Sequence, residues 1–475
     1  MFERFAKSLV SVLLLASLIL ATPVSAQQDH DYSELEKVAL AELKETDTPG
    51  AAVVVVSGDR AVVVKGFGVA NIETGVPVTT DTLFRIGGIS KFLTATVLVS
   101  LAEEGKIDLN VPIGRYVKGL SPKLSRVTAQ QLLSETAGVK EDHLRLGLYD
   151  DAALGNIVRS WKNDWLIAEP GRIQSGSHPG YAVAGLLIEE VAGKPFADVM
   201  NEKLFSPLGM TRSTFRPLLA FTYPFSQGHR TASGQKPTVV RPFAANSVGW
   251  PSYSLFSTVN DLSRFLIAFL NGGKLDGRRV ISQSVIAKLA RAPTSGPAVV
   301  GQERSYGLAS ARYGSHHVLS GNFSWGGMRP LIRIVPDARF AIIIFSNGGS
   351  RHLTKTVEKA MQMFLGPPGK PETIASESLP MTQVEMSAYL GTYENERVMT
   401  LFLKDSRLFI RDDTHPAMTM GSLTDGAELP VTKVGENRFS ISPVRTSEST
   451  LFTIIAGHNG RIEYLHIGGR ALKRR

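Results

Sequence analysis

The chain has 475 residues, a net charge of +9 and no cysteine. A chain of this length exceeds one ordinary hydrophobic core, so we expect two or more domains. The lack of cysteine excludes disulfides, thiolate nucleophiles and cysteine metal sites. The basic residues are scattered apart from the tail at 470–475, and they form no basic helix that would indicate nucleic-acid binding.

The first 26 residues predict a secretory signal peptide. Arg4 and Lys7 precede an apolar run at 9–20, and Val24-Ser25-Ala26 offers small residues for cleavage. The run is too short to span a membrane comfortably, and no later segment of the sequence is long and apolar enough to do so. We therefore expect an exported protein, periplasmic or secreted, with no membrane span.

Patterns of apolar residues predict one antiparallel sheet built from both ends of the first domain. Helical spacing covers 32–45, and two strands at 51–57 and 61–66 are joined by the tight-turn pair Gly58-Asp59. Later elements are predicted at 127–219 (a mainly helical region), 262–270 (helix), 306–313, 331–335 and 340–345 (strands) and 353–365 (helix). The predicted fold class is α/β (α+β), an antiparallel sheet flanked by helices with an inserted helical lobe.

A change in composition then separates a second domain. Residues 366–380 are rich in Pro, Gly and Ser and predict a linker. Short alternating strands after it, at 399–403, 407–411, 438–443, 451–456 and 461–467, predict a small all-β barrel. The predicted organisation is a signal peptide at 1–26, a first domain at 31–365, the linker at 366–380 and the barrel at 381–475.

The stretch 84–105, FRIGGISKFLTATVLVSLAEEG, predicts the central helix of the first domain. Its core at 92–102 has no charge and few polar groups, and helices that are apolar all round are buried. Lys91 lies in the first turns of this helix. A buried ammonium group is costly unless it is paired or neutralised, so Lys91 needs a structural or a chemical reason.

Several stretches together resemble the serine β-lactamase-like family, in its order and at its spacing: PGAAVVVVSGD, QLLSETAGV, GYAVAGLLIEEVAGKPFADVM, LFSPLGMTRSTF and FSTVNDLSRFLIAFLNGGKL. This family includes class C β-lactamases, penicillin-binding proteins of low molecular weight, D-aminopeptidases and related esterases. The resemblance covers roughly 31–365. The C-terminal barrel resembles the lipocalin-like appendage found on many members.

The resemblance implies a catalytic Ser-x-x-Lys motif at the start of the central helix. In the family the serine is acylated and the lysine, one turn further on, helps to remove its proton. The matching residues here run from Gly88 to Lys91, so the lysine is present and the serine is replaced by glycine. Ser90 is adjacent in sequence but points in another direction on a helix, and we do not expect it to replace the missing hydroxyl.

Two further motifs of the family also meet glycine in this chain. Tyr-x-Asn, whose tyrosine is a general base and whose asparagine binds the substrate amide, matches Gly176-Ser177-His178. Lys-Thr-Gly or His-x-Gly, on a strand edge, matches Gly321-Asn322-Phe323, whereas a shift of one turn would place Leu319 at its first position. Because glycine removes bulk at three positions, we expect a wider cleft than in active members.

The candidate ligand-binding residues are Gly88, Ser90, Gly176, Ser177, His178, Gly321, Asn322 and Trp325, with Lys91 as the one retained catalytic residue. Alternative interpretations stand beside these. Lys91 can be a structural residue paired with a carboxylate, His178 an ordinary satisfied histidine, and Trp325 a packing residue. No metal site is expected because the histidines lack ligand spacing, and no cofactor is expected.

The sequence supports three hypotheses about function. The leading one is a catalytically disabled, exported family member that binds a small-molecule or peptidoglycan-like ligand carrying a carboxylate. The second is a hydrolase of ester, β-lactam or D-amino-acid peptide substrates with altered catalytic residues, for example with Lys91 as a neutral amine nucleophile. The third is a cell-envelope scaffold that acts through residues 381–475.

Overall fold

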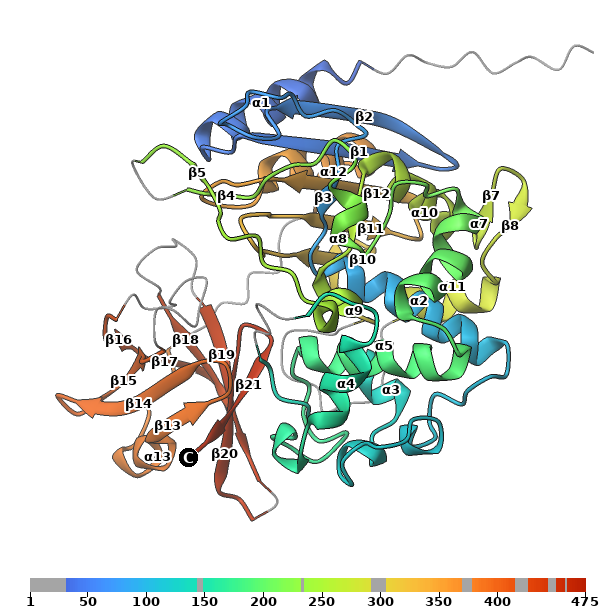
Figure 1. The fold of residues 1–475 in the computed structure, drawn as a ribbon. Coiled ribbons are helices and arrows are strands. Elements are labelled where there is room, and N and C mark those ends of the chain that lie inside the picture. The colour runs from blue at the N-terminus through green and yellow to red at the C-terminus, as the bar shows by residue number, and fades with distance from the viewer. Residues whose placement is uncertain are drawn as a thin grey trace, which may run out of the picture.

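The computed structural model describes residues 31–142, 148–231, 235–291, 305–369, 378–414, 426–442, 450–457 and 459–475. It contains a six-stranded sheet covered by helices and, below it in Figure 1, a separate nine-stranded sheet that forms a nearly closed barrel. The predicted fold class and the C-terminal barrel are thus confirmed. The predicted signal peptide at 1–26 lies outside the described residues, and the bounds of the domains and the linker stay predictions.

The six-stranded antiparallel sheet joins the two ends of the first domain. Its strands follow the order β2 (Arg60–Gly68), β1 (Gly50–Ser57), β12 (Phe340–Ser346), β11 (Leu331–Val335), β10 (His316–Asn322) and β9 (Ala309–Tyr313). β1 pairs with β2 on one side and with β12 on the other. The predicted strands at both ends of this domain therefore lie in one sheet, whereas β10 was not predicted as a strand.

β1 is apolar along its whole length because both of its faces are covered. Successive side chains of a strand point to opposite faces. Val54 and the residues two positions before and after it pack in the main core, together with helix α2 (Ile89–Glu103). Val53 and the residues two positions before and after it pack in a second core. That second core is closed by helices α1 (Ser33–Glu45) and α12 (Thr354–Leu365).

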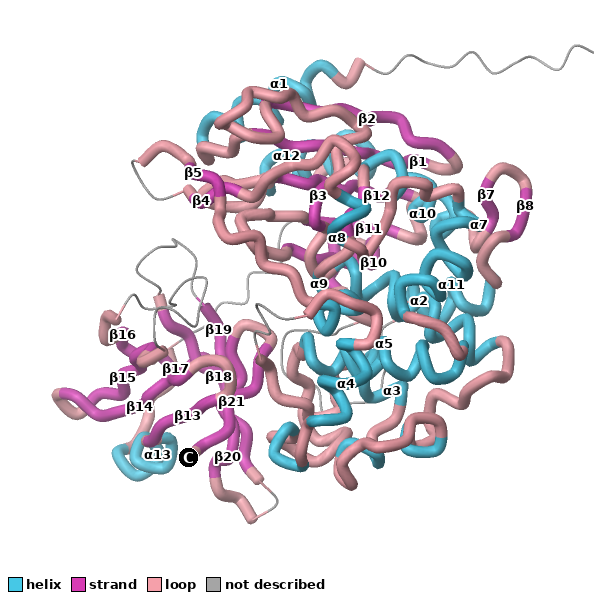
Figure 2. The backbone as a smooth tube through the Cα atoms, viewed as in Figure 1, coloured by secondary structure: helices cyan, strands magenta, loops and turns pink. Residues whose placement is uncertain are grey.

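α2 (Ile89–Glu103) is the buried helix predicted from the apolar stretch, since 12 of its 15 residues are buried. The helical lobe around it is the cyan group at the lower right of Figure 2. The other helices of this domain between α2 and β9 are α3 (Ala129–Leu133), α4 (Ala153–Ser160), α5 (His178–Ala192), α6 (Phe196–Met200), α7 (Ser206–Leu208), α8 (Pro217–Ala220), α9 (Trp250–Tyr253), α10 (Val259–Leu270) and α11 (Gln283–Ala290). Of these, α10 packs against the sheet. Short strand pairs β3 (Phe84–Arg85) with β6 (Phe256–Ser257), β4 (His229–Arg230) with β5 (Thr238–Val239), and β7 (Lys274–Leu275) with β8 (Arg278–Arg279) complete this domain.

The barrel follows helix α13 (Gln383–Tyr389) and includes all five predicted strands. Its strands are β13 (Gly391–Glu394), β14 (Val398–Lys404), β15 (Arg407–Asp412), β16 (Leu429–Pro430), β17 (Thr432–Gly435), β18 (Arg438–Ile441), β19 (Thr450–Ala456), β20 (Ile462–Ile467) and β21 (Arg470–Arg474). The sequence patterns missed β13, β16, β17 and β21. The basic tail at 470–475 contains β21, which is a central strand between β13 and β20.

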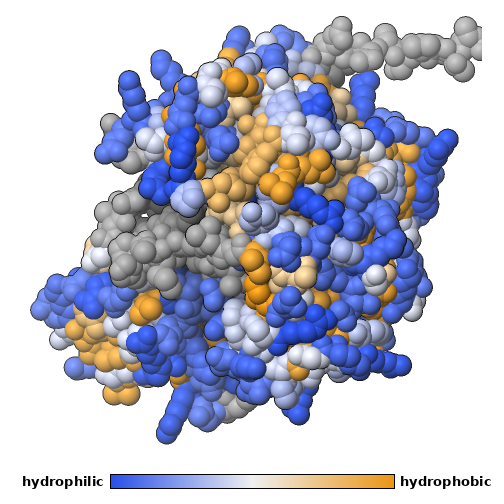
Figure 3. Space-filling view, viewed as in Figure 1, coloured by the Kyte–Doolittle hydropathy of each residue, from blue (hydrophilic) through white to orange (hydrophobic). Residues whose placement is uncertain are grey.

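The surface carries few large apolar side chains. Figure 3 shows an apolar area over the region of α8, where Leu218, Leu219 and Phe221 are exposed. Among the helices that the structure describes, none is long and apolar enough to cross a membrane.

Candidate active-site cleft

The N-terminus of α2 opens into a small pocket between the helical lobe, the end of β10 and the barrel. Gly87 adopts a φ of +56°, a turn conformation that glycine tolerates best, and Gly88 caps the helix. The pocket has a volume of about 240 Å³. It is lined by Gly87, Gly88, Lys91, Gly176, His178, Tyr253, Gly307, Asn322, Phe323, Ser324, Trp325, Gly468 and Arg470.

The ring of Phe323 occupies the space where the side chain of residue 88 would begin. A Cβ atom added to Gly88 would lie less than 3.0 Å from two atoms of this ring. A Cβ atom on Gly321 would meet the same ring equally closely. Two of the three motif glycines therefore lie against one aromatic side chain, which itself stands at the glycine position of the third motif.

The prediction of a wider cleft is wrong at these positions because close packing has refilled the space. The backbone of Phe323 is also held on both sides. Its N–H donates to the carbonyl of Pro330 at 2.9 Å, and its carbonyl accepts a hydrogen bond from Nε2 of His352 at 2.8 Å. These bonds fix the backbone from which the ring projects, and the ring itself is held by packing.

Lys91 is paired with Glu135, a residue to which the sequence assigned no role. Lys91 Nζ lies 2.6 Å from Glu135 Oε1, and both side chains are buried. Burial lowers the pKa of Lys91, the neighbouring Arg470 lowers it further, and Glu135 opposes both. The interpretation of Lys91 as a cation paired with a carboxylate therefore agrees with the geometry.

The third motif glycine, Gly176, lies against a residue of the barrel. A Cβ atom on Gly176 would be 3.2 Å from Nη1 of Arg470, which stands directly after the turn between β20 and β21. Arg470 donates hydrogen bonds to the carbonyl of Gly176 and to the buried carboxylate of Glu141. Sequence reasoning missed both charged residues, since nothing in the local pattern marks residue 470 as part of a cleft.

Aromatic side chains form a further wall of the pocket. Tyr253 packs edge to face on His178, with ring centroids 4.9 Å apart, and against Trp325 at 4.7 Å. Asn322 lines the pocket, and its Oδ1 accepts from Arg333 at 2.9 Å. Gly88, Lys91, Gly176, His178, Asn322 and Trp325 thus line one pocket. Gly321 is not part of this lining and lies against the ring of Phe323.

Ser90 and Ser177 do not line this pocket. Ser90 Oγ donates to the carbonyl of Gly87 at 2.8 Å and accepts from the N–H of Leu255 at 3.2 Å. Ser177 is the N-cap of α5, where its Oγ accepts from the N–H of Gly180 at 2.9 Å. Both hydroxyls form hydrogen bonds with backbone groups. Ser90 and Ser177 are therefore removed from the candidate ligand-binding residues.

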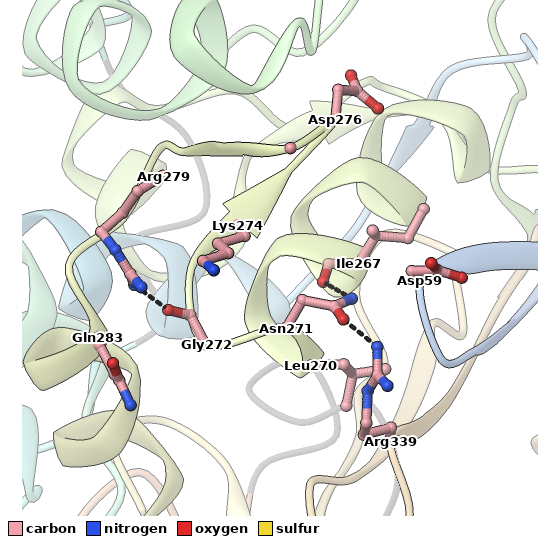
Figure 4. A pocket seen from close by; sticks show the side chains of 11 residues that line it. Asp59, Ile267, Leu270, Asn271, Gly272, Lys274, Asp276, Arg279, Gln283 and Arg339 are labelled. Atoms are coloured by element: carbon pink, nitrogen blue, oxygen red, sulfur yellow. Dashed lines mark hydrogen bonds between the residues drawn. The ribbon is translucent and has the colours of Figure 1, made fainter.

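A larger groove, of about 740 Å³, lies away from all of these residues (Figure 4). It surrounds the C-terminal end of α10 and the β7–β8 turn. Arg279 donates to the carbonyl of Gly272 at 2.6 Å, and Arg339 donates to the side chain of Asn271. We assign the site to the smaller pocket instead, because Gly88, Lys91 and Gly176 of the matched motifs line it. Over the described ranges, no cluster of three or more His, Asp or Glu residues could hold a metal ion.

We predict that Gly88→Ala destabilises the protein by about 1–3 kcal/mol, the usual cost of overpacking a core. Adding Phe323→Ala should make the Gly88→Ala change cost less, since the colliding ring is gone. Urea unfolding of the unmodified chain, the two single variants and the double variant measures this coupling. Gly369→Ala, at a position with open space around the added Cβ, is the control and should have little effect. Additive effects of the two substitutions would contradict the packing argument.

Lys91→Met should cost about 3–5 kcal/mol of unfolding free energy, because it leaves the Glu135 carboxylate buried without its cation. The double variant Lys91→Met/Glu135→Gln should recover part of this loss. As a comparison, Lys37→Met removes an exposed pair with Glu34 and should leave stability nearly unchanged. If Glu135→Gln lowered the stability of the Lys91→Met variant further, the lost ion pair would not explain the effect of Lys91→Met.

Burial raises the pKa of Glu141 to about 7, although Arg470 and Lys91 lower it. The folded state therefore holds a proton that the unfolded state has lost, and stability should fall as pH rises from about 4.5 to 7, by on the order of 3 kcal/mol. Glu141→Gln should reduce this slope in urea midpoints measured at pH 5 and pH 8.

The slope should not vanish, because Glu189 has its pKa raised by burial to about 7 as well. Glu169→Gln removes an exposed carboxyl and serves as the matched control, with the slope unchanged. An unchanged slope in Glu141→Gln would show that this carboxyl does not titrate in the folded protein near neutral pH.

Known proteins share this fold and resemble part of this sequence. The Beta-lactamase family matches residues 35–360. "Penicillin-binding protein 4" of Amycolatopsis lactamdurans is 28% identical over 375 residues, covering 74% of this chain and 94% of that protein. "Protein flp" of Staphylococcus aureus (strain N315) is 22% identical and covers 68% of this chain and 65% of its own length.

Solved structures extend the likeness to the barrel. The structure of SurE with D-Leu superposes with a TM-score of 0.74 at 20% identity, covering 93% of this chain and 100% of that one. The octameric penicillin-binding protein homologue from Pyrococcus abyssi has a TM-score of 0.62 at 20% identity and covers 93% of this chain and 99% of its own. At these identities the structures show the shared fold alone, and the matched family establishes that this chain belongs to the Beta-lactamase family.

Proposed function

We propose that this chain is a non-acylating member of its family that binds a small ligand in the pocket at the N-terminus of α2. The observation that carries the proposal is the ring of Phe323 at the position where a nucleophile at residue 88 would begin. Nucleophilic catalysis needs a nucleophile with a base within hydrogen-bond reach. Lys91 is held by Glu135 instead, and Gly176 supplies no base.

The ligand we propose is a peptidoglycan- or peptide-derived carboxylate of one or two residues. The pocket volume of about 240 Å³ lies below the roughly 300–1,000 Å³ of drug-sized sites. Its cations, Lys91 and Arg470, each lie beside carboxylates, so charge alone gives weak attraction. The aromatic wall of Tyr253, Phe323 and Trp325 would then supply apolar contact. The D-Leu bound to SurE makes D-amino acids the first probes to use.

We also propose that the chain is exported, on the basis of the charged, apolar and small-residue segments within residues 1–26. Export would place the pocket where cell-wall peptides occur.

We predict no covalent adduct when the protein is incubated with a fluorescent penicillin and analysed by intact-mass spectrometry. Gly88→Ser alone should also give none, because Phe323 obstructs the restored hydroxyl. The variant Gly88→Ser/Gly321→His/Phe323→Gly rebuilds two motifs and removes the ring, and it should be the first to acylate. An adduct on the unmodified chain at any serine would end the proposal.

Ligand binding is measured separately, by titration calorimetry with D-Leu and with acetyl-D-alanyl-D-alanine. Trp325→Ala should weaken binding roughly threefold to tenfold, the range expected for losing one aromatic contact. Leu218→Ala, on the exposed face of α8, is the control that should leave affinity unchanged. Absence of saturable binding for both probes would contradict this ligand class. If the chain hydrolysed an ester or peptide substrate and lost this activity in Lys91→Ala, the altered-hydrolase hypothesis would be favoured instead.

A further inference from the structure

The barrel supplies one wall of the pocket through the turn between β20 and β21. Gly468 and Arg470 line the pocket beside Gly176, which belongs to the first domain. In Figure 1 these strands are the part of the barrel that faces the helical lobe. The pocket is therefore complete only while the two units are docked.

A short run of polar contacts makes this docking. The N–H of Gly176 donates to the carbonyl of Gly469 at 3.0 Å, and the N–H of Ala471 donates to Ser175 Oγ at 3.0 Å. Between them, Arg470 reaches past Gly176 to the carboxylate of Glu141. Three consecutive barrel residues thus bind one short loop of the first domain.

Buried charges converge on Arg470. Glu141 is buried completely, and Glu396 lies 3.6 Å from Nε of Arg470 on the barrel side. Removing one member of such a group leaves another charge buried without compensation, which is strongly unfavourable. When Glu141 is ionised, it and Arg470 therefore prefer to be either fully paired or fully hydrated, and the hydrated state requires the barrel to move away.

The remainder of the interface combines polar contacts with one apolar cluster. Tyr464 donates to the carbonyl of Ile167 at 3.1 Å, and Arg172 pairs with Glu463 at 2.8 Å. The apolar cluster between the units has four buried members among the described residues, Ala168, Ile173, Tyr464 and Ala471. Interfaces of this kind between domains commonly allow relative motion.

We propose that the C-terminal barrel gates the cleft in cis, with Arg470 as the latch. While Arg470 is bound to Glu141, the β20–β21 turn fills the side of the cleft next to Gly176. When this contact breaks, the barrel moves as one body, because β20 and β21 are each paired with a neighbouring strand as well as with each other. The cleft then opens towards residues 175–177.

The absence of cysteine allows a direct test on the full chain. Ser175→Cys places a single thiol beneath the turn, at a site that is 3% exposed while the barrel is docked. Its alkylation by iodoacetamide reports how often the barrel moves away. Adding Arg470→Ala should speed the alkylation at least about tenfold. Arg461→Ala, which removes an exposed arginine from the same barrel, should leave the rate unchanged.

A second thiol distinguishes opening of the cleft from general unfolding. Ser257→Cys lies in the buried strand β6 of the first domain and should be alkylated at the same slow rate with or without Arg470→Ala. Equal acceleration at both thiols would overturn the proposal, as would no acceleration at residue 175. No ligand takes part in this test, so its outcome is independent of the proposed binding function.

Discussion

The cleft depends on a constraint of space: one aromatic ring and two side chains cannot occupy the same volume. The ring of Phe323 lies where Cβ atoms on Gly88 and Gly321 would be. Interiors are packed at nearly crystalline density, so a gain of volume at one position requires a loss at its neighbours. The two glycines and the phenylalanine therefore form one packing unit, in which the missing side chains leave room for the ring. None of the three explains the cleft by itself.

A chain of buried charges forms the second element of the cleft. Lys91 is bound to Glu135, and Arg470 is bound to Glu141 with Glu396 nearby. Each cation that faces the pocket thus has a carboxylate beside it, which weakens the attraction for an anionic ligand. The same pairing stabilises the arrangement of the loop that holds Gly176, since Glu135 also accepts the N–H of Ser177 at 3.2 Å.

Much of the fold could be predicted from the sequence, because the pattern of apolar residues indicates which side chains are buried. The helix around Leu98 and the strand around Val54 are apolar on all sides and are buried on all sides. The partners of the site could not be predicted in this way. Phe323 carries no signal that its ring reaches back over Gly88, and Arg470 stands in a segment that looked like a basic tail. Both contacts join residues far apart in the chain, and only the folded arrangement brings them together.

Because Arg470 lies far along the chain, the cleft is completed only late in synthesis. Domains fold mostly in order because the chain is made from its N-terminus, at about 5–20 residues per second. The first domain has all six strands of its sheet once residue 346 is made, whereas Arg470 follows more than a hundred residues later. For an interval on the order of ten seconds, Glu141 would face water and the cleft would lack one wall. During that interval, a factor that recognises the newly folded first domain would have access to the loop at 175–177 without any opening of the barrel.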